Sequence, residues 1–396
     1  MNINDLLNVS LLKDHIFKGV VSEIKHPDYP NLKIYNYTHV AQHDNIWDSV
    51  TEQCRGLIVD SGTGDVLARP FRKFFNLNTS FRPETHEVNL PSWQPKVLEK
   101  LDGSLGILYH YAGKPYIATR GSFASDQANW ATKWYNEHYH PSDSGLYTDP
   151  DWPEGYTPLF EIIYKENRIV VSYEYEGLVL LGLVNIKTGF ELSSEETSTW
   201  GNRNGLRVAT EYQEFTLEKC KSFAESNREG FVLQYWNSKA PIPLRIKIKT
   251  EEYVRLHKVI TGLNPKGIWE HLMSGYDPEA LWRPAIHNKQ FVEWCTGWIT
   301  TFQRMYDKTE SEAISAFGRV AIFSTSQLTR TTPKPDERAT RKVWAMAIQQ
   351  EPANLHPILF ACLSGGDWKV QIWKQFEPKI LGKEVYIRNA DEFNGL

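Results

Sequence analysis

The stretch KVLEKLDGSLGILYHYAGKPYIAT, residues 96–119, indicates the class of fold. Within it, Leu105, Ile107 and Tyr109 alternate with smaller or polar residues, and Gly113-Lys114-Pro115 then interrupts the apolar pattern. A period of two, followed by a turn and a second apolar run, is typical of a β-hairpin. The stretch therefore predicts an antiparallel pair of strands.

The same hairpin pattern recurs on both sides of this stretch, in residues 55–71, 168–192 and 231–250. Between these runs, NWATKWYNEHY at residues 129–139 has the character of a short helix. Residues 140–158 are rich in Pro, Gly and Asp and are expected to form an exposed loop. The first part of the chain is thus predicted to consist of antiparallel sheets with flanking helices.

After Tyr253 the pattern changes from strands to helices. Apolar residues recur there at steps of three and four, which trace one face of a helix. These residues are Phe291, Trp294, Cys295, Trp298, Ile299, Phe302 and Met305. Residues 342–350 and 357–365 are further helix candidates.

We expect a domain boundary near Tyr253 to His257. An α+β domain would then occupy residues 1–253, and a smaller, all-helical domain would occupy residues 254–396.

Composition excludes several classes of protein. The 396 residues are 41% apolar and 23% charged, which is ordinary for a folded protein and unlike a disordered or collagenous chain. The longest aliphatic run, residues 178–184, is far too short to cross a bilayer. The first residues carry acids and lack the apolar core of a secretion signal. The four cysteines are widely separated, so we expect neither a CxxC zinc site nor a disulfide framework, and a reducing, cytosolic compartment.

Chemistry is suggested by the segment Glu99-Lys100-Leu101-Asp102-Gly103-Ser104. Neither the dinucleotide-binding GxGxxG pattern nor the P-loop GxxxxGK[ST] pattern is present. A KxDG sequence alone is a weak signal, because a lysine often precedes an Asp-Gly turn. Its charged companions strengthen the signal, since several lie in apolar strand patterns where an unpaired charge is costly. They are Arg55, Lys73, Arg120, Glu161, Glu229, Lys247 and Lys249.

Lys247 and Lys249 are spaced to act together. On a strand, residues two apart point to the same face. Two ammonium groups on one face repel each other unless an anion lies between or near them, and a nucleoside triphosphate is such an anion. Glu161 and Glu229 would balance the cations and hold a divalent metal ion directly or through water.

The order and spacing of these motifs resemble the covalent nucleotidyltransferase superfamily of polynucleotide ligases and RNA capping enzymes. Within it, the chain is similar to the bacteriophage RNA ligase 1 family. The resemblance covers most of residues 35–260, while the tail matches in helical character more than in motifs. The motifs that carry it are KFFN at 73–76, ENRIV at 166–170, EGFV at 229–232 and KIK at 247–249, with Tyr253 four residues later.

The resemblance implies an ATP-dependent RNA ligase that works in three steps. Lys100 attacks the α-phosphate of ATP, releases pyrophosphate and retains AMP as a lysyl phosphoramidate. The AMP then passes to an RNA 5′-phosphate. Finally, a 3′-hydroxyl attacks the activated phosphate, which seals the strand and frees AMP. Residues 1–253 would be the nucleotidyltransferase domain of this enzyme.

The resemblance also implies roles for individual residues. Glu161 resembles the residue that binds the ribose, Glu229 resembles the acid that organises a catalytic Mg²⁺ or Mn²⁺, and Gly103 gives the backbone close access to the nucleotide. The implied catalytic residues are Lys100, Glu229, Lys247 and Lys249. The implied nucleotide-binding residues are Tyr37, Arg55, Lys73, Lys100, Gly103, Arg120, Glu161, Lys247 and Lys249. Arg120 departs from the family, which usually has a lysine there, and a guanidinium fork differs from a point charge.

The first step needs Lys100 without its proton. A free lysine has a pKa of about 10.4, so deprotonation close to neutral pH costs about 4 kcal/mol at roughly 1.4 kcal/mol per unit. Burial and neighbouring cations lower the pKa of a lysine. We therefore expect Lys247, Lys249 and a bound metal ion to lower the pKa of Lys100.

The helical domain carries two further candidates. Asp277 matches a family metal contact, although it also has the position of a helix N-cap before Pro278. A basic side is formed by Arg319, Arg330, Lys334, Arg338, Arg341 and Lys342. This side is either an exposed loop and helix start or a set of phosphate contacts to structured RNA.

In the family, the helical domain favours tRNA that is broken in its anticodon loop. The resemblance thus predicts that residues 254–396 bind RNA or tRNA. The protein would be a monomer that acts on single-stranded RNA ends, in the host cytosol if a phage encodes it.

Two alternatives remain open at this point. A capping-type guanylyltransferase also uses a KxDG lysine, but it selects GTP and needs a small β-barrel of the OB type after the last lysine motif. The helical pattern after Tyr253 argues against such a barrel. It argues equally against a DNA ligase of the same superfamily. An inactive RNA-binding relative would keep the fold and lack at least one charged motif residue, whereas all of them are present here.

Overall fold

The computed structural model describes residues 1–139, 150–224, 227–237, 240–286, 288–331 and 336–378. Part of the predicted exposed loop, residues 140–149, lies outside the described residues, as does Lys334 of the predicted basic side. Contacts within the chain divide it into one unit that ends at His257 and a second unit that begins at Lys258.

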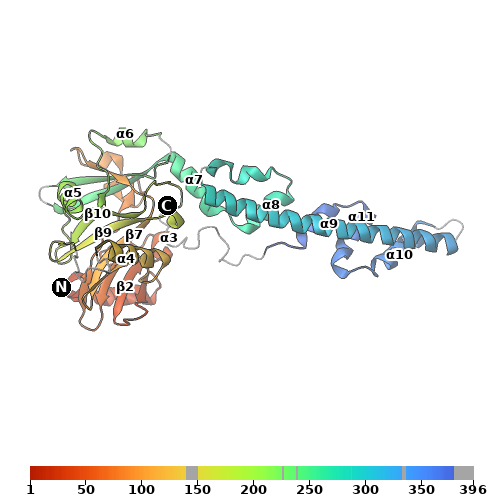
Figure 1. Ribbon diagram of the computed structural model, residues 1–396, viewed down its shortest axis with the longest axis horizontal. Coiled ribbons are helices and arrows are strands. Elements are labelled where there is room, and N and C mark those ends of the chain that lie inside the picture. The colour runs from red at the N-terminus through yellow and green to blue at the C-terminus, as the bar shows by residue number, and fades with distance from the viewer. Residues whose placement is uncertain (140–149, 225–226, 238–239, 287, 332–335, 379–396) are drawn as a thin grey trace. The chain divides into compact units, whose positions relative to one another are not determined.

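Three sheets build the first unit (Figure 1). The first sheet has the order β1-β2-β3-β4, the second β11-β10-β9-β7-β8, and the third β5-β13-β12-β6. The described pairs are antiparallel, except that β10 with β11 and β5 with β13 run parallel. The predicted α+β class with mainly antiparallel sheets is confirmed. The strands are β1 (Val21–Lys25), β2 (Leu32–Tyr37), β3 (Arg55–Asp60), β4 (Asp65–Ala68), β5 (Phe75–Asn76), β6 (Lys96–Lys100), β7 (Ser104–Tyr111), β8 (Lys114–Ala118), β9 (Tyr156–Ile163), β10 (Gly177–Asn185), β11 (Arg207–Val208), β12 (Gly230–Asn237) and β13 (Ala240–Lys249).

Helices flank these sheets, as the sequence predicts. On the second sheet, Ala131 and Tyr135 of α4 join Leu108, Ile117 and Phe160 in one buried cluster. This cluster covers one face of the second sheet, and the opposite face lines the pocket described below. The helices are α1 (Ile3–Leu6), α2 (Val9–Phe17), α3 (His39–His43), α4 (Asp126–Tyr139), α5 (Ser194–Arg203) and α6 (Leu217–Lys221), with the 3-10 helices η1 (Pro83–Thr85), η2 (Glu87–Asn89) and η3 (Lys165–Asn167).

The hairpin predicted in residues 96–119 is confirmed, with a small shift of its turn. Tyr111 pairs with Lys114, so Ala112 and Gly113 form a two-residue turn, with φ values of 49° and 75°. Positive φ at both positions matches the right-handed twist of the flanking strands. The hairpins predicted in residues 55–71 and 231–250 are also present, as β3 with β4 and β12 with β13.

The hairpin predicted in residues 168–192 is present only at its end, where Val184 and Glu191 form an antiparallel bridge, and its first half is wrong. Residues 168–176 form no strand, and β10 pairs instead with β9, with Gly177 opposite Ile163. The backbone N–H groups of Val170 and Val171 both donate to one carboxylate oxygen of Asp102, at 2.9 Å. The apolar residues of this segment are therefore buried as a loop whose hydrogen bonds go to a side chain rather than to a strand.

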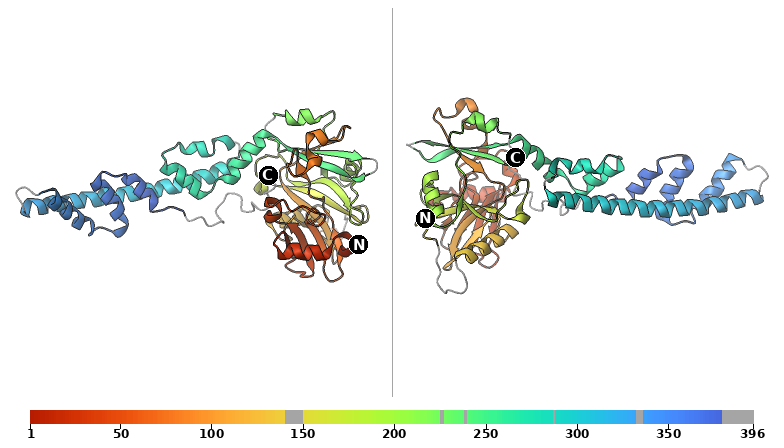
Figure 2. Two further views of the ribbon diagram at one scale, coloured as in Figure 1. Left: turned by 180° about the vertical axis from the view of Figure 1, so that it is seen from behind. Right: turned by 45° about the horizontal axis from the view of Figure 1, so that its top comes forward.

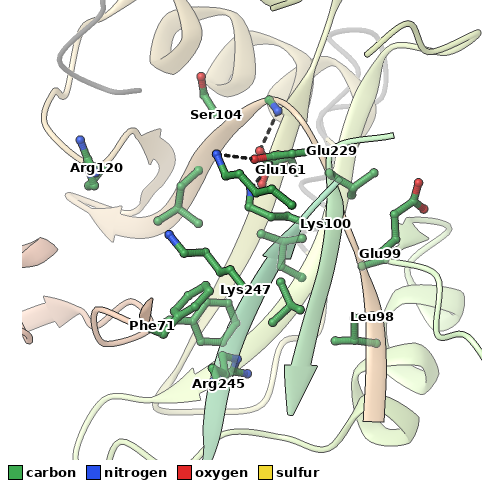
Figure 3. Close-up of a pocket in the computed structure, with 18 of the residues that line it drawn as sticks. Phe71, Leu98, Glu99, Lys100, Ser104, Arg120, Glu161, Glu229, Arg245 and Lys247 are labelled. Carbon is green, nitrogen blue, oxygen red and sulfur yellow. Dashed lines mark hydrogen bonds and ion pairs between the residues drawn. The ribbon is translucent and has the colours of Figure 1, made fainter. Parts of the chain in front are cut away.

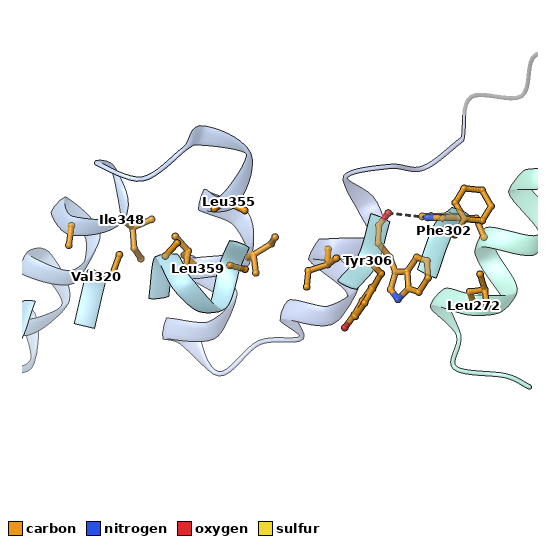
Figure 4. Packing of buried hydrophobic residues seen from close by; sticks show 14 of the residues in the cluster. Leu272, Phe302, Tyr306, Val320, Ile348, Leu355 and Leu359 are labelled. Atoms are coloured by element: carbon orange, nitrogen blue, oxygen red, sulfur yellow. Dashed lines mark hydrogen bonds between the residues drawn. The ribbon is translucent and has the colours of Figure 1, made fainter. Parts of the chain in front are cut away.

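The described part of the second unit is helical. Most of its buried hydrophobic residues belong to one cluster, which includes Leu272, Phe302, Tyr306, Val320 and Leu359 (Figure 4). The elements from the end of the third sheet onward are α7 (Glu251–Gly262), within which the boundary between the units falls, α8 (Pro265–Met273), η4 (Pro278–Leu281), η5 (Arg283–Ala285), α9 (Lys289–Thr331), α10 (Glu337–Ile348), η6 (Ala353–Leu355), α11 (His356–Ser364) and α12 (Trp368–Lys374).

The long helix α9 follows the predicted periodicity and extends it. It lies beside α10, α11 and α12 in both views of Figure 2. Phe291, Cys295 and Phe302 are buried as expected, but Met305 is 40% exposed and Tyr306 is buried in its place. The helical period of 3.6 residues returns to the buried face at Tyr306 rather than at Met305. No helix within the described residues combines the length and the apolar character needed to cross a lipid bilayer.

Candidate active site

A pocket of about 190 Å³ in the first unit is lined mainly by side chains from the second and third sheets, with further residues from β2 and β3 of the first sheet and from α7 (Figure 3). The third sheet contributes residues of β6, β12 and β13, and the second sheet contributes residues of β7, β9 and β10. All of the residues predicted as catalytic or nucleotide-binding line this pocket. They are Tyr37, Arg55, Lys73, Lys100, Gly103, Arg120, Glu161, Glu229, Lys247 and Lys249.

The register of the third sheet brings the charged motifs together. On the central strand β12, Gly230 pairs with Lys100 of β6 on one side and with Lys249 of β13 on the other. Val232, two residues further along β12, pairs with Lys247. Because residues two apart share a face, Lys247 and Lys249 both line the pocket, as the sequence predicts.

Gly230 is required by this close approach of strands. Its φ is +151°, and a Cβ atom there would lie 2.0 Å from the carbonyl oxygen of Ile248. Both features exclude a larger residue directly after Glu229. The Glu-Gly pair of the sequence thus serves to place the Glu229 side chain at the end of β12.

Lys100 and Glu229 form an ion pair in the pocket. Lys100 Nζ lies 2.6 Å from Glu229 Oε2, and Lys249 Nζ lies 3.2 Å from Glu229 Oε1. Burial favours the neutral carboxyl group, but the charges of Lys100 and Lys249 prevail and lower the pKa of Glu229. Glu229 is therefore a carboxylate that is shared by two lysines.

The expected lowering of the Lys100 pKa is wrong for this structure. Burial acts in the expected direction, but the carboxylates of Glu229 and Glu161 outweigh it and raise the pKa of Lys100. The sequence shows which charges are present but not which of them lies nearest. Here the nearest charge is negative, so Lys100 is held as an ammonium ion.

Glu161 faces the same space from β9. Its Oε1 accepts a hydrogen bond from the backbone N–H of Gly103 at 2.9 Å. Burial raises the pKa of Glu161 to about 8, even though Lys100 opposes this shift. A Cβ atom on Gly103 would lie 2.5 Å from the carbonyl oxygen of Ile162, so this glycine lets the Lys100 segment pack closely against β9.

A cluster of cations surrounds the phenol of Tyr37. Arg120 Nη1 donates to the Tyr37 hydroxyl at 2.9 Å, and Lys73 Nζ donates to it at 3.3 Å. Burial would raise the pKa of Tyr37, but the charges of Arg120, Lys73 and Arg55 lower it to about 7. This end of the pocket is therefore strongly electropositive.

Lys247 lies between the two groups of charges. Its pKa falls well below the ordinary lysine value because of burial and of the cations Lys73, Lys100 and Lys249. Within the described part of the chain, no carboxylate pairs with its ammonium group. A bound anion would remove this unfavourable excess of positive charge.

Two residues that sequence reasoning did not assign complete the site through Asp102. The Asp102 side chain is buried and accepts hydrogen bonds from the Tyr253 hydroxyl at 2.8 Å and from the backbone of Val170 and Val171. The backbone N–H of Asp102 donates a hydrogen bond to the Tyr173 hydroxyl oxygen at 2.7 Å. The aspartate of KxDG thus joins the lysine segment to a loop and to α7, a role that no local pattern reveals.

Arg245 and Gln234 line the pocket and were also missed. The alternation R-I-K-I-K contains the signal for Arg245, because it places this residue on the same face as the two lysines. Arg245 pairs with Glu191 and lies 4.1 Å from the ring centroid of Phe71. Gln234 lies opposite Arg245 in the β12–β13 register.

The predicted metal ligands are not assembled into a protein-only site. Among the described residues, no three His, Cys, Asp or Glu side chains are grouped so as to hold a metal ion. Asp277 belongs to the second unit, where it caps η4 through the Glu279 N–H and pairs with Arg283 at 2.7 Å. The N-cap interpretation of Asp277 is therefore confirmed.

The first unit is thus an α+β fold with a pocket that is lined by cations and contains the ion pair between Lys100 and Glu229. Residues 53–253, about half of the chain, match the model of the family described as RNA ligase, and the chain belongs to that family.

Individual relatives agree with this assignment. A putative RNA ligase of Thermovibrio ammonificans is 33% identical over 215 residues, which cover 54% of each chain. The RNA ligase of Rhodothermus phage RM378 is 26% identical over 294 residues, which cover 60% of this chain and 66% of the relative. The putative bifunctional polynucleotide kinase/RNA ligase of Autographa californica nuclear polyhedrosis virus is 29% identical, with 60% of this chain and 35% of the relative covered. The chain thus spans from about a third to two thirds of the length of these relatives.

Proposed function

We propose that this protein is an ATP-dependent RNA ligase that joins RNA 5′-phosphate and 3′-hydroxyl ends. The proposal is carried by the placement of Lys100 in a pocket that also contains Lys247, a buried lysine with no carboxylate partner among the described residues. A nucleoside triphosphate supplies the missing negative charge, and its α-phosphorus is an electrophile for the Lys100 amine. Membership of the RNA ligase family supports ATP as this nucleotide.

In the first step, the Lys100 ammonium must lose a proton. The cations Lys247 and Lys249, and a metal ion bound to Glu229, would favour release of this proton to water. The neutral Nζ then forms a bond to the α-phosphorus while the bond between the α-phosphorus and the bridging oxygen breaks, and pyrophosphate leaves with the electron pair. Lys247, Lys249 and the cluster around Tyr37 stabilise the negative charge that develops.

Mg²⁺ or Mn²⁺ suits this donor set. Both ions accept one carboxylate together with phosphate oxygens and water, so Glu229 would hold the ion with the nucleotide present. The bound ion supplies neutralising charge at the phosphates. A metal contact by Asp277 remains a prediction, and its ion pair with Arg283 offers it no support.

In the later steps, AMP passes from Lys100 to the RNA 5′-phosphate, and the RNA 3′-oxygen then displaces AMP as the hydroxyl releases its proton. We take tRNA with a broken anticodon loop as the natural substrate, by analogy with the family. Arg330, Arg338 and Lys342 support this choice, because they are exposed in the second unit and have no ion-pair partner among the described residues. Such cations bind phosphates without reading sequence.

We further propose that the protein is a monomer and that it acts in the cytosol, which is the host cytosol if a phage encodes it. Its four cysteines, Cys54, Cys220, Cys295 and Cys362, are free thiols, which suits a reducing compartment.

The proposal is tested by labelling the protein with radioactive ATP or GTP in the presence of Mg²⁺ or Mn²⁺. We expect acid-labile label from ATP. Label from GTP alone would favour a capping enzyme, and absence of label from either nucleotide would favour an RNA-binding relative without catalysis.

The variant Lys100→Ala separates the steps. It should lose self-labelling and the sealing of ordinary 5′-phosphate ends, yet still join RNA that is already adenylylated, because that substrate bypasses the first two steps. Self-labelling of the variant would show that the nucleophile is a different residue.

A further inference from the structure

A second cavity of about 580 Å³ adjoins the nucleotide pocket. It lies entirely within the first unit and is lined by residues of β1, β2 and α3 and by the segment that leads into α4. Tyr37 and Arg120 line both cavities, so these two side chains form a shared wall. Figure 3 shows Arg120 at the side of the nucleotide pocket away from Glu229.

The lining of this second cavity differs from that of the first in its chemistry. The nucleotide pocket presents an excess of cations, whereas the second cavity is lined mostly by hydroxyl and amide groups, together with the side chains of Arg120, His39 and Asp126. The guanidinium of Arg120 already donates to the Tyr37 hydroxyl at 2.9 Å. An isolated phosphate would therefore bind the first pocket in preference to the second.

Two acceptors in the second cavity lack donors among the described residues. Asn36 Oδ1 is buried and accepts no hydrogen bond. The Asp126 carboxylate, on the first residue of α4, takes part in no described ion pair or side-chain hydrogen bond. Asp126 is exposed, so the cost of a buried acceptor without a donor, about 1–3 kcal/mol, applies to Asn36 Oδ1 alone, and a ligand that offers hydroxyl donors would be favoured there.

The geometry points to this cavity as the binding site for the 3′-terminal nucleotide of the RNA strand that carries the attacking hydroxyl. This inference rests on the proposed ligase function. A 3′-terminal ribose carries two adjacent hydroxyl donors, the 2′-OH and the 3′-OH, which match the two free acceptors. The shared wall places this ribose next to the phosphates held by the nucleotide pocket, which is where the joining step requires it.

Gly121 provides a way to block the cavity without disturbing the fold. Its φ lies outside the left-handed region, and a Cβ atom there would meet only Asn36 Nδ2, at 3.7 Å. Gly121 lines the second cavity and not the nucleotide pocket. The variant Gly121→Leu therefore fills the cavity, while Asn36→Leu removes one acceptor at nearly constant size.

The experiment uses the full chain and pre-adenylylated RNA in the absence of ATP, with acceptor strands that end in ribose or in 2′-deoxyribose. We expect the wild type to prefer the ribose end by about three- to tenfold in kcat/KM, the range for one hydrogen bond. Asn36→Leu should reduce this preference, and Gly121→Leu should raise KM for both acceptors. Asn202→Leu, at an exposed position on α5 outside both cavities, is the matched control and should keep the preference.

Other outcomes would overturn the inference. An unchanged preference in Asn36→Leu together with an unchanged acceptor KM in Gly121→Leu would show that the cavity does not hold the 3′ end. The two variants could instead lose equal activity in transferring AMP to a 5′-phosphate strand whose 3′ end is blocked. That result would assign the cavity to the strand that carries the 5′-phosphate. Self-labelling with ATP reports on the proposed function separately, because a wild type that fails to label itself contradicts that function rather than the location of the 3′ end.

Discussion

Lys100 keeps its proton in this structure because the Glu229 carboxylate lies 2.6 Å from its ammonium group. Glu229→Gln removes the negative charge and keeps the size of the side chain. Burial lowers the pKa of Lys100, and in this variant the Glu229 charge no longer counteracts that lowering. We expect the pKa of Lys100 to fall. The measurement is the pH dependence of Lys100 acetylation, followed by mass spectrometry.

Glu99→Gln is a matched control for this measurement. Glu99 is adjacent to Lys100 and lines the pocket, but its described ion pair is with Arg228, at 3.5 Å. The variant should leave the acetylation profile of Lys100 in place. A profile that is unmoved by Glu229→Gln, or moved equally by both variants, would contradict the dominance of the Glu229 ion pair.

Tyr37 is expected to ionise near neutral pH, because Arg120, Lys73 and Arg55 lower its pKa from 10.0 to about 7. Near-ultraviolet absorbance should therefore show one tyrosinate forming around pH 7 in the wild type and none in Tyr37→Phe. A folded pKa below the unfolded one adds stability that is fully present above pH 10.0 and is lost as the pH falls through about 7. Relative to the variant, the wild type should gain stability between these values, and a flat difference would contradict the cation cluster.

The identity of the pocket residues was predictable from sequence, but the sign of the Lys100 shift was not. Motif order identifies Lys100, Glu229, Lys247 and Lys249, because each type of residue suits the chemistry. The pKa of Lys100 depends on which neighbour lies within about 3 Å, and Coulomb energies fall with distance. That distance is set by strand register between segments more than a hundred residues apart.

At the scale of elements, the third sheet holds the site together through Gly230. We expect Gly230→Ala to destabilise the protein by at least about 1–3 kcal/mol, because of its positive φ and of the clash with the Ile248 carbonyl. Self-labelling should also fall, since Glu229 would shift with the strand. Urea denaturation measures the stability.

Gly297→Ala is the matched control for this glycine. Gly297 lies in α9, and a Cβ atom there would meet no atom within 4 Å. Alanine is favoured over glycine by about 1 kcal/mol in a helix interior, so the control should be neutral or stabilising. Similar losses of stability in both variants would show that the register around Gly230 is not specially constrained.

Elements with local signals were predictable, and elements that depend on distant contacts were not. The β12–β13 hairpin follows from alternation within residues 231–250. Residues 168–176 have a similar apolar pattern, yet they form a loop because Val170 and Val171 donate to Asp102, far away in the chain. Nothing within the segment itself indicates that partner.

At the scale of the whole molecule, the lining of the nucleotide pocket lies within the first unit, whose last residue before the boundary is His257. The change of pattern after Tyr253 placed a boundary in the same region of the sequence. The assignment of catalysis to the first unit and of RNA binding to the second remains a prediction that truncation tests.

A chain that ends after Gly262, the last residue of α7, should retain self-labelling with ATP, since Lys100 and its neighbours are all present. It should lose the preference for broken tRNA over an unstructured RNA of equal length, because the exposed cations of α10 are absent. Its affinity for tRNA should also depend less on salt, since fewer phosphates are neutralised. The full chain with Arg338→Gln and Lys342→Gln is the companion variant, and it should shift in the same direction by a smaller amount. A truncated chain that labels itself and keeps the full preference for tRNA would contradict the assignment of RNA binding to the second unit.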